Sequence, residues 1–210
     1  MKTSLTCALA VAVVPAVLLG FQSIGPAPLF DGTTFNGWEG NRALFRIESG
    51  AIVAGTLAAK IERNEFLCTT REYKDFELRL RVKLLGGDAA NAGIQFRTRR
   101  IPDHHEVIGY QADMGTGWWG ALYDESRRKK VLTGPDQAKM KALIREGEWN
   151  DYIIRAEGPR IQLTINGFQT VDYVETDATV TDSGVICVQI HSGPPSEAWY
   201  RDITIAAPTK

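Results

Sequence analysis

The segment from Gly109 to Arg128 gathers the side chains best suited to chemistry in this 210-residue chain. It reads GYQADMGTGWWGALYDESRR and combines an amide, carboxylates, tyrosines and two adjacent tryptophans between closely spaced glycines. Because each glycine costs a helix about 1 kcal/mol, we expect two strands joined by a tryptophan-bearing loop. Flat aromatic faces stack on sugar rings, while amides and carboxylates bind hydroxyl groups. The segment therefore indicates carbohydrate chemistry.

Two carboxylates of this segment are candidates for acid–base catalysis. Asp113 and Glu125 stand at alternating positions of the two expected strands, and Tyr123 shares the face of Glu125. Cleavage of a glycosidic bond commonly uses one carboxylic acid to protonate the leaving oxygen and a second as base or nucleophile. Two other roles stay open for Asp113: a structural ion pair with Arg97 or Arg127, or direct binding of a ligand.

One polar sheet face is expected to carry Gln95, Arg97, Gln111, Asp113, Tyr123, Glu125, Gln189 and His191. Period-two alternation in several segments puts amides and charged groups on one side and apolar residues on the other. His191 could transfer a proton near neutral pH, or it could only hydrogen-bond the Ser-Gly-Pro-Pro turn that follows. The expected catalytic residues are Asp113, Glu125, His191 and Tyr123, and the expected substrate-binding residues are Asn91, Gln95, Arg97, Gln111, Trp118, Trp119 and Gln189. Their apolar alternates Ile94, Phe96, Ile108, Ala112, Leu122, Val188 and Ile190 are expected to fill the core.

The adjacent rings of Trp118 and Trp119 should have different environments. Both stand in a glycine-flanked loop, where at most one ring can easily face the core. The other is either a platform for a sugar or a cap over the end of the fold. Trp38 and Trp149 are expected to be packing residues.

Strand signals dominate the rest of the chain. Phe76–Leu84 alternates strictly between apolar and charged residues, and Asn166-Gly167 is a strong hairpin signal. Strands are expected at Phe76–Leu84, Gly93–Arg99, Trp149–Glu157, Arg160–Ile165, Phe168–Tyr173, Val185–His191 and Trp199–Ile205. Only Asp136–Arg145 has a helical pattern. The sequence predicts an all-β fold with little helix, a jelly-roll sandwich of two antiparallel sheets.

Charge and cysteine content limit the classes of binding partner and cofactor that the chain can have. The formal net charge is −1, so the chain lacks the basic footprint that nucleic acids require. Cys68 and Cys187 could form a disulfide or remain buried thiols. No cysteine or histidine spacing resembles a zinc site, and no cofactor is predicted. A divalent metal stays open at His104-His105, which Asp103 and Glu106 flank.

The N-terminus is typical of an export signal. Lys2 precedes the apolar run Leu5–Leu19, which contains Pro15 and is shorter than a comfortable membrane span. We expect a signal peptide over about residues 1–25, followed by a single domain over residues 26–210 that lacks a membrane span. An uncleaved signal anchor is the alternative. Export would place the domain in the periplasm or outside the cell.

Several motifs resemble the 3-keto-disaccharide hydrolase family, long described as a domain of unknown function. They run in order over about residues 29–206: LFDGTTFNGW at 29–38, NAGI at 91–94 with FR at 96–97, GY at 109–110, GALY at 120–123, GEWN at 147–150, NG at 166–167, QIH at 189–191 and YRDI at 200–203. The resemblance implies a concanavalin-like or laminin-G-like sandwich, export in bacteria and action on oxidised glycosides. Many members carry Gly-Tyr-Glu-x-Gln where this chain has Gly-Tyr-Gln-Ala-Asp at 109–113.

The resemblance also implies a reaction, the hydrolysis of 3-keto-glycosides. A ketone at C3 acidifies the proton on C2, so a base can remove it while the glycosidic oxygen leaves C1, and water then adds back. Asp113, Glu125 or His191 could be the base, and Tyr123 or Arg97 could steady the enolate. The alternatives are a non-catalytic carbohydrate-binding module and a structural domain of the cell surface.

Overall fold

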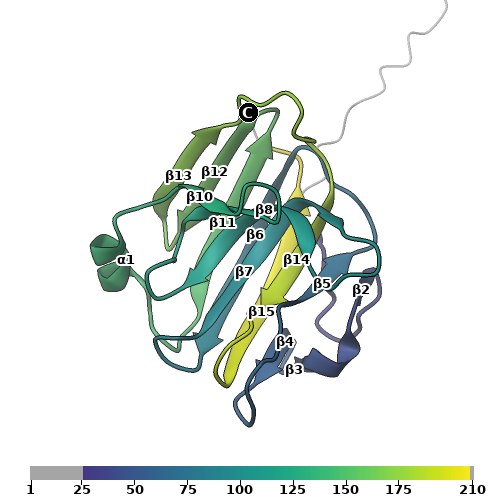
Figure 1. Cartoon of the computed structure of the whole chain (residues 1–210), viewed down its shortest axis with the longest axis vertical. Coiled ribbons are helices and arrows are strands. Elements are labelled where there is room, and N and C mark those ends of the chain that lie inside the picture. Colours follow the sequence, from purple (N-terminus) through teal and green to yellow (C-terminus); the bar gives the residue numbers. More distant parts are fainter. Residues whose placement is uncertain (1–25, 209–210) are drawn as a thin grey trace, which may run out of the picture.

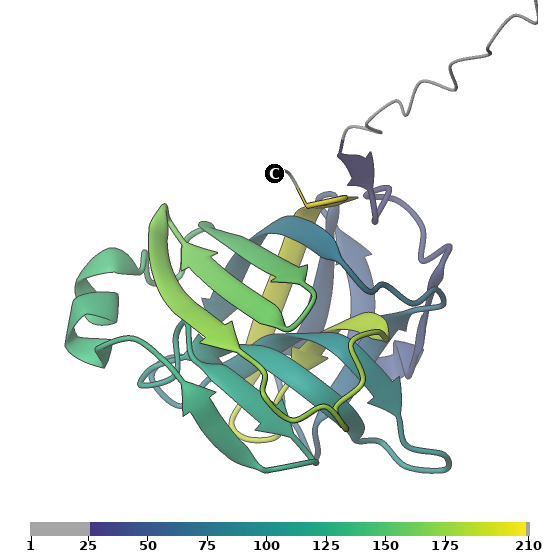
Figure 2. The same cartoon turned by 90° about the horizontal axis from the view of Figure 1, so that it is seen from above.

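The computed structural model describes residues 26–208, which form two antiparallel sheets packed face to face (Figures 1 and 2). The elements are β1 (Ala27–Pro28), β2 (Trp38–Gly40), a 3-10 turn (Arg42–Leu44), β3 (Phe45–Glu48), β4 (Ala51–Thr56), β5 (Glu65–Thr69), β6 (Phe76–Leu85), β7 (Asn91–Arg100), β8 (Val107–Gly115), β9 (Leu122–Glu125), β10 (Lys130–Thr133), α1 (Gln137–Leu143), β11 (Asn150–Glu157), β12 (Arg160–Ile165), β13 (Phe168–Val174), β14 (Val185–Ile190) and β15 (Ser196–Ala206). Sheet A runs β13-β12-β11-β6-β15-β4-β3 with β1 beside β15, and sheet B runs β10-β9-β8-β7-β14-β5-β2. The predicted all-β sandwich is confirmed.

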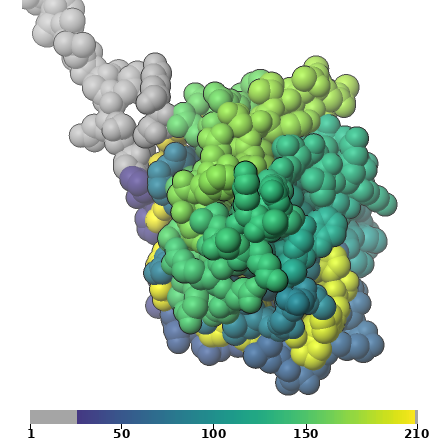
Figure 3. All heavy atoms as spheres, turned by 90° about the vertical axis from the view of Figure 1, so that its left-hand side faces the viewer, coloured from purple at the N-terminus to yellow at the C-terminus, as the bar shows by residue number. Residues whose placement is uncertain are grey.

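Local sequence explains the elements that were predicted. The helix α1 begins after Asp136, whose side chain accepts a hydrogen bond from the backbone N–H of Ala138 at 2.9 Å and caps it. Asn166 and Gly167 both have positive φ, and Ile165 pairs with Phe168, so they form the expected two-residue hairpin turn. The helix lies at one side of the sandwich (Figure 1), and Figure 3 shows that side covered largely by segments drawn in green, from the middle of the chain.

The strands before residue 70 were not predicted, because they carry no alternation. Residues of β5 are buried on both faces, and β4 is buried along all but its last residue. A strand covered on both sides shows no period of two, and the two- to four-residue strands β1, β2 and β3 are too short to show one.

The core lies between the two sheets. The apolar side of β6 meets the expected apolar residues of sheet B there: Ile94, Phe96, Ala112, Leu122, Val188 and Ile190. One expectation is wrong, because Ile108 is only half-buried and lies outside this core. Both tryptophans that were expected to pack do so: Trp38 is buried in the core, and Trp149 packs on the outer face of sheet A, edge-on to Trp199 at 6.4 Å.

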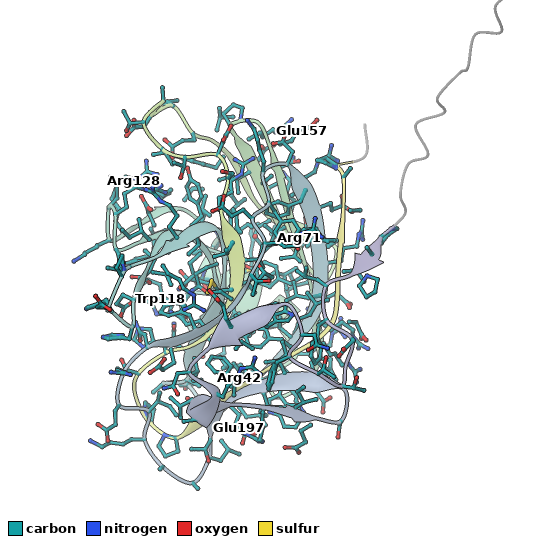
Figure 4. All side chains as sticks on the ribbon, turned by 90° about the vertical axis from the view of Figure 1, so that its right-hand side faces the viewer. Arg42, Arg71, Trp118, Arg128, Glu157 and Glu197 are labelled. Atoms are coloured by element: carbon teal, nitrogen blue, oxygen red, sulfur yellow. A yellow bond between two sulfur atoms is a disulfide. The ribbon has the colours of Figure 1, made fainter. Side chains whose placement is uncertain are left out.

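A disulfide joins two strands on the outer face of sheet B. Cys68 on β5 and Cys187 on β14 are directly paired and bonded through their sulfur atoms (yellow in Figure 4). Phe66 and Val107 pack against them in a small apolar cluster. Disulfides form in oxidising compartments, so this bond agrees with the expected export. The predicted signal peptide lies outside the described residues, and within residues 26–208 no helix is long and apolar enough to cross a membrane.

We expect the disulfide to contribute substantially to stability. It closes a loop whose ends lie 119 residues apart, and opening it restores chain entropy to the unfolded state. The double variant Cys68→Ser/Cys187→Ser should lose about 2–5 kcal/mol in the free energy of unfolding, measured by urea denaturation. Wild-type protein treated with reductant should behave like the variant. An unchanged denaturation midpoint in both samples would contradict this role.

Candidate functional site

The outer face of sheet B, turned away from the core, carries most of the predicted site residues. Strand register pairs Gln95 with Gln111 and Gln111 with Tyr123. Paired residues point to the same side of a sheet, and so do residues two apart along a strand. This face therefore holds Asn91, Gln95, Gln111, Asp113, Tyr123, Glu125, Gln189 and His191. The alternation expected from the sequence is confirmed for seven of these residues, and Asn91 joins them through its register on β7.

A chain of side-chain hydrogen bonds runs along the face. Gln95 Nε2 donates to Gln111 Oε1, and Gln111 Nε2 donates in turn to Asp113 Oδ1. Gly93, between Gln189 and Asp113, leaves space for this arrangement, because a Cβ at that position would come within 2.7 Å of Gln111 Cγ and Cδ. This chain of hydrogen bonds, from Gln95 through Gln111, thus orients the Asp113 carboxyl.

Several polar atoms of this face are buried without a hydrogen-bond partner. They are both amide atoms of Gln189, Oε1 of Gln95 and Oδ2 of Asp113. A buried unpaired polar group costs about 1–3 kcal/mol, so such groups are rare and call for an explanation. All four belong to side chains that are at most 2% exposed, so they form one buried polar cluster. We name the three glutamines Gln95, Gln111 and Gln189 the amide row.

Burial raises the pKa of both carboxyl groups toward neutrality. The pKa of Asp113 rises to about 7 through desolvation; the Gln111 hydrogen bond opposes this rise, and the Glu125 charge adds to it. The pKa of Glu125 also rises to about 7, through desolvation first and the charge of Glu106 second. Desolvation and the Glu125 charge raise the pKa of Tyr123, which keeps its hydroxyl a donor. Groups that are half-protonated near pH 7 suit proton transfer.

The two carboxyls lie apart on neighbouring strands, with Tyr123 between them. Glu125 pairs with Gly109, while the backbone N–H of Asp113 donates to Ala121 O at 3.0 Å. This register separates their Cα atoms by four residues along the strands, about 13 Å. Their side chains therefore lie on one face of sheet B, on either side of Tyr123.

The two tryptophans have opposite environments. Trp119 is only 9% exposed and belongs to the core, so its predicted contact with substrate is wrong. Trp118 is 43% exposed and lies edge-on to Tyr123, with 6.5 Å between ring centroids (labelled in Figure 4). An exposed ring beside the carboxyls is a candidate platform for a sugar.

Arg97 does not lie on this face, and its predicted position beside Gln95 is wrong. The pairing of β7 with β8 shifts between Phe96 and Arg99, and Arg97 has a φ of 48°, so a bulge turns its side chain away. The guanidinium is buried and donates to Gly158 O at 2.7 Å and to Asp75 Oδ1 at 3.1 Å.

Neither arginine considered as a structural partner contacts Asp113. Arg97 binds Asp75, as described above, and Arg127 pairs with Asp124 at 2.8 Å. The protein neighbour of the Asp113 carboxyl is instead Gln111. A structural ion pair of Asp113 with either arginine is therefore excluded.

His191 and Asn91 form the border of the face. The backbone N–H of His191 donates to Asn91 O at 3.1 Å just beyond the end of β14, and its Nδ1 lies 2.7 Å from Ser192 O. The turn contact that the sequence left open is thus present. Within residues 26–208 no group of three or more histidine, cysteine, aspartate or glutamate residues is arranged to hold a metal ion.

Sequence reasoning missed two residues in loops over this face. Asn64, before β5, donates from Nδ2 to Glu106 Oε1 at 3.0 Å and accepts at Oδ1 from the Ser192 N–H at 2.9 Å. Glu106, before β8, is the carboxylate whose charge acts on Glu125. Loops have no periodicity that reveals where a side chain points, so no signal in the sequence could have placed them. A cavity of ≈ 560 Å³ lies beside them, lined in part by Arg63, Phe66 and His105.

The chain resembles known proteins in sequence and in fold. The model of the 3-keto-alpha-glucoside-1,2-lyase-like domain matches residues 25–206. A putative glycosyl hydrolase from Parabacteroides distasonis superposes with a TM-score of 0.66 at 17% identity, over 88% of this chain and 95% of that one. The carbohydrate-binding module CBM66 from Bacillus subtilis has a TM-score of 0.64 at 13% identity, over 81% and 96%.

A protein of unknown function with a galectin-like fold, also from Bacillus subtilis, has a TM-score of 0.64 at 10% identity, over 88% of this chain and 96% of that one. At these identities the three likenesses establish a shared fold. No curated protein matches this sequence.

We expect ionisation of Asp113 to lower stability as the pH rises to neutrality. Its pKa in the folded state lies above the value of about 3.9 in unfolded chains, so the folded state binds more protons between these values and stability falls as pH rises through about 7. Asp113→Asn removes this penalty, which is at most about 4 kcal/mol. The thermal midpoint of the variant minus that of wild type should be larger at pH 8 than at pH 5.

The exposed residue Asp103 supplies the control, because Asp103→Asn should shift the midpoint equally at both pH values. A difference between Asp113→Asn and wild type that does not change with pH would contradict the raised pKa.

Proposed function

This chain belongs to the 3-keto-alpha-glucoside-1,2-lyase-like family, and we propose that it cleaves 3-keto-glycosides by acid–base chemistry on the outer face of sheet B. The observation that carries the proposal is the pair of carboxyls Asp113 and Glu125, which border one polar patch and titrate near neutrality. Family membership supports a carbohydrate substrate, and the exposed ring of Trp118 beside Tyr123 fits one.

Asp113 is the better candidate for the base. One of its oxygens accepts a hydrogen bond from Gln111, which favours the ionised form, and the other is unpartnered. The base takes the proton from C2 of the sugar, next to the C3 ketone. The electron pair of that C–H bond first delocalises onto the C3 oxygen as an enolate. The ketone then re-forms as a C1–C2 double bond forms, and the glycosidic oxygen leaves C1 with its bonding pair.

Glu125 is the better candidate for the acid. Desolvation and the charge of Glu106 favour its protonated form, so it can give its proton to the leaving oxygen. The Tyr123 hydroxyl, between the two carboxyls, can donate to the enolate oxygen that develops at C3. Addition of water across the double bond then completes a net hydrolysis and restores both carboxyls.

The exchange of acid and amide relative to many family members fits this assignment. Positions 111 and 113 share one face and are hydrogen-bonded to each other through Gln111 Nε2 and Asp113 Oδ1. A carboxyl and an amide in either order therefore occupy the same patch. In this chain the order places the carboxyl next to Gly93, on the side of Gln189.

A carbohydrate-binding module is the second candidate. Trp118 is exposed beside Tyr123, and stacking on such rings suffices for sugar binding without catalysis. Turnover distinguishes the two candidate functions, because only an enzyme releases the group that is bonded to C1 through the glycosidic oxygen.

We expect the carboxyl variants to lose turnover on a 3-keto-glucoside. Asp113→Asn and Glu125→Gln should each lower kcat by about 10²–10⁴, because each removes one proton-transfer group. Wild-type activity should be greatest near pH 7, where one group can be ionised and the other protonated. The exposed Glu72→Gln variant is the control and should retain full activity. Full turnover in both carboxyl variants would refute the mechanism, and binding without turnover in wild type would favour the module.

We expect Trp118 to act in binding rather than in chemistry. Trp118→Ala should raise KM or the sugar Kd about tenfold, which corresponds to 1.4 kcal/mol, while kcat changes little. Phe168 gives a matched control, since it is 44% exposed against 43% for Trp118 and lies on sheet A. Equal effects of Trp118→Ala and Phe168→Ala in calorimetric titrations would show that the ring has no specific role.

A further inference from the structure

Arg97 has no part in the chemistry proposed for the outer face of sheet B, but it lines a cavity at one end of the sandwich. This end cavity has a volume of ≈ 540 Å³, a size typical of sites for small molecules. Arg97 and Tyr110 line it from sheet B, and the Gly158-Pro159 turn between β11 and β12 lines it from sheet A. Residues 175–182, in the loop between β13 and β14, form the remaining wall. The end cavity shares no lining residue with the polar outer face.

An unusual backbone conformation directs the guanidinium of Arg97 to this cavity. Arg97 has a φ of 48°, in the left-handed region that residues other than glycine rarely adopt. Gly184, at the end of the loop, packs directly on this bulge, because a Cβ at that position would lie 2.6 Å from the Arg97 carbonyl carbon. Bulges and unfavourable backbone conformations of this kind often direct a side chain beside a functional site.

The guanidinium is held in a fixed position and keeps donors in reserve. Its Nε donates to Lys74 O at 2.9 Å, and its two terminal nitrogens donate to Gly158 O at 2.7 Å and to Asp75 Oδ1 at 3.1 Å. These bonds occupy three of the five N–H groups of a guanidinium. One N–H on each terminal nitrogen therefore has no acceptor within residues 26–208. The side chain is 2% exposed and lines the end cavity, so it belongs to the floor of the cavity.

The loop that forms the wall is anchored at both of its ends. At its start, Glu175 accepts a hydrogen bond from Tyr110 Oη at 2.6 Å and donates its own N–H to Pro159 O at 2.9 Å. At its end, Asp182 Oδ2 lies 2.8 Å from Lys74 Nζ. The end cavity is therefore formed in the absence of a ligand, which lowers the entropy that binding would cost.

The charges that line the end cavity disfavour an anionic ligand. Four charged side chains line it, and three of them have ion-pair partners, namely Arg97, Glu175 and Asp182. Asp177 has no such partner within residues 26–208. Its Oδ1 accepts from the N–H and the Oγ1 of Thr179 at 2.9 and 2.6 Å, which leaves Oδ2 as an acceptor for a ligand. The uncompensated charge of Asp177 would repel an anion.

A neutral molecule with several hydroxyl groups fits these donors and acceptors. A hydroxyl group both donates and accepts, so neighbouring hydroxyls can donate to Asp177 Oδ2 and accept from the N–H groups of Arg97. Thr176 and Thr181 are exposed in the wall and add hydroxyl groups of their own. The exposed ring of Pro159 offers apolar surface for the C–H face of a sugar ring.

We propose that the end cavity is a second binding site, which takes a neutral sugar unit between Arg97 on its floor and Asp177 in its wall. The inference does not depend on the proposed function, because the end cavity contains neither Asp113 nor Glu125. A sugar bound here is held and not cleaved. The domain could therefore bind one part of a carbohydrate at this end while the outer face of sheet B meets another part.

The test is a ¹H–¹⁵N NMR titration of the ¹⁵N-labelled protein with neutral and charged monosaccharides. The neutral probes are the methyl α-glycosides of glucose, galactose and mannose, and the charged probe is glucuronate. At least one neutral probe should shift the backbone signals of Gly158, Thr176 and Thr181 to saturation, with a Kd in the millimolar range. Glucuronate should bind about tenfold more weakly, because the charge of Asp177 repels it.

Two variants locate the sugar. Asp177→Asn keeps the acceptor for Thr179 but replaces Oδ2 with a donor, so it should raise the Kd of the neutral probe about tenfold. Ala178→Trp places a large ring in the wall of the end cavity and should abolish the shifts. Asp31→Asn is the matched control and should leave the Kd unchanged, because Asp31 likewise accepts from the N–H two residues ahead, that of Thr33 at 2.7 Å, and does not line the end cavity.

The outcomes separate this inference from the proposed function. Failure of all three neutral probes to shift the signals of the end cavity would overturn the inference, and so would tighter binding of glucuronate. Shifts confined to Trp118 and Tyr123 would also overturn it and would leave the proposed function standing. Saturable shifts at the end cavity in a protein that cleaves no 3-keto-glycoside would support the second site and overturn the proposed function instead.

Discussion

Desolvation of polar side chains on the outer face of sheet B is the constraint on which the site depends. In water, an aspartate and a glutamate are ionised at neutral pH and of little use as a matched acid and base. Buried on this face, Asp113 and Glu125 both titrate near 7. The same burial strengthens every hydrogen bond and charge interaction in the patch, including the bond from Gln111 to Asp113.

Such burial requires the outer face of the sheet to be covered, and the chain achieves this with loops and a covalent bond. The Cys68–Cys187 disulfide joins β5 to β14, and Phe66 and Val107 pack against it beside the amide row. Asn64 links the loops before β5 and β8 to the end of β14. The apolar core between the sheets supplies the rigid support, so that groups on several strands keep their relative positions.

The stability of this face and its proposed activity make opposing demands. Unpartnered atoms on Gln189, Gln95 and Asp113 cost folding free energy that a hydrophobic or fully hydrogen-bonded surface would not. Replacing such groups should stabilise the protein and remove the chemistry, as in many enzymes whose active sites are locally unfavourable. The disulfide and the tightly packed core offset this local cost elsewhere in the domain.

Period-two alternation in the sequence was enough to determine the sandwich class, the core faces of the longer strands and the shared face of seven polar residues, because successive side chains of a strand point to opposite faces. The prediction of side-chain direction from alternation failed where the backbone departs from a regular strand. A bulge at positive φ turns Arg97 off the face, and the loop at 115–121 buries Trp119 while it exposes Trp118. Only the tertiary structure could pair Cys68 with Cys187, bring Asn64 and Glu106 over the sheet, and separate Asp113 from Arg97 and Arg127. These contacts join residues far apart in the chain, and they depend on how loops fold over a surface, for which local sequence carries no period.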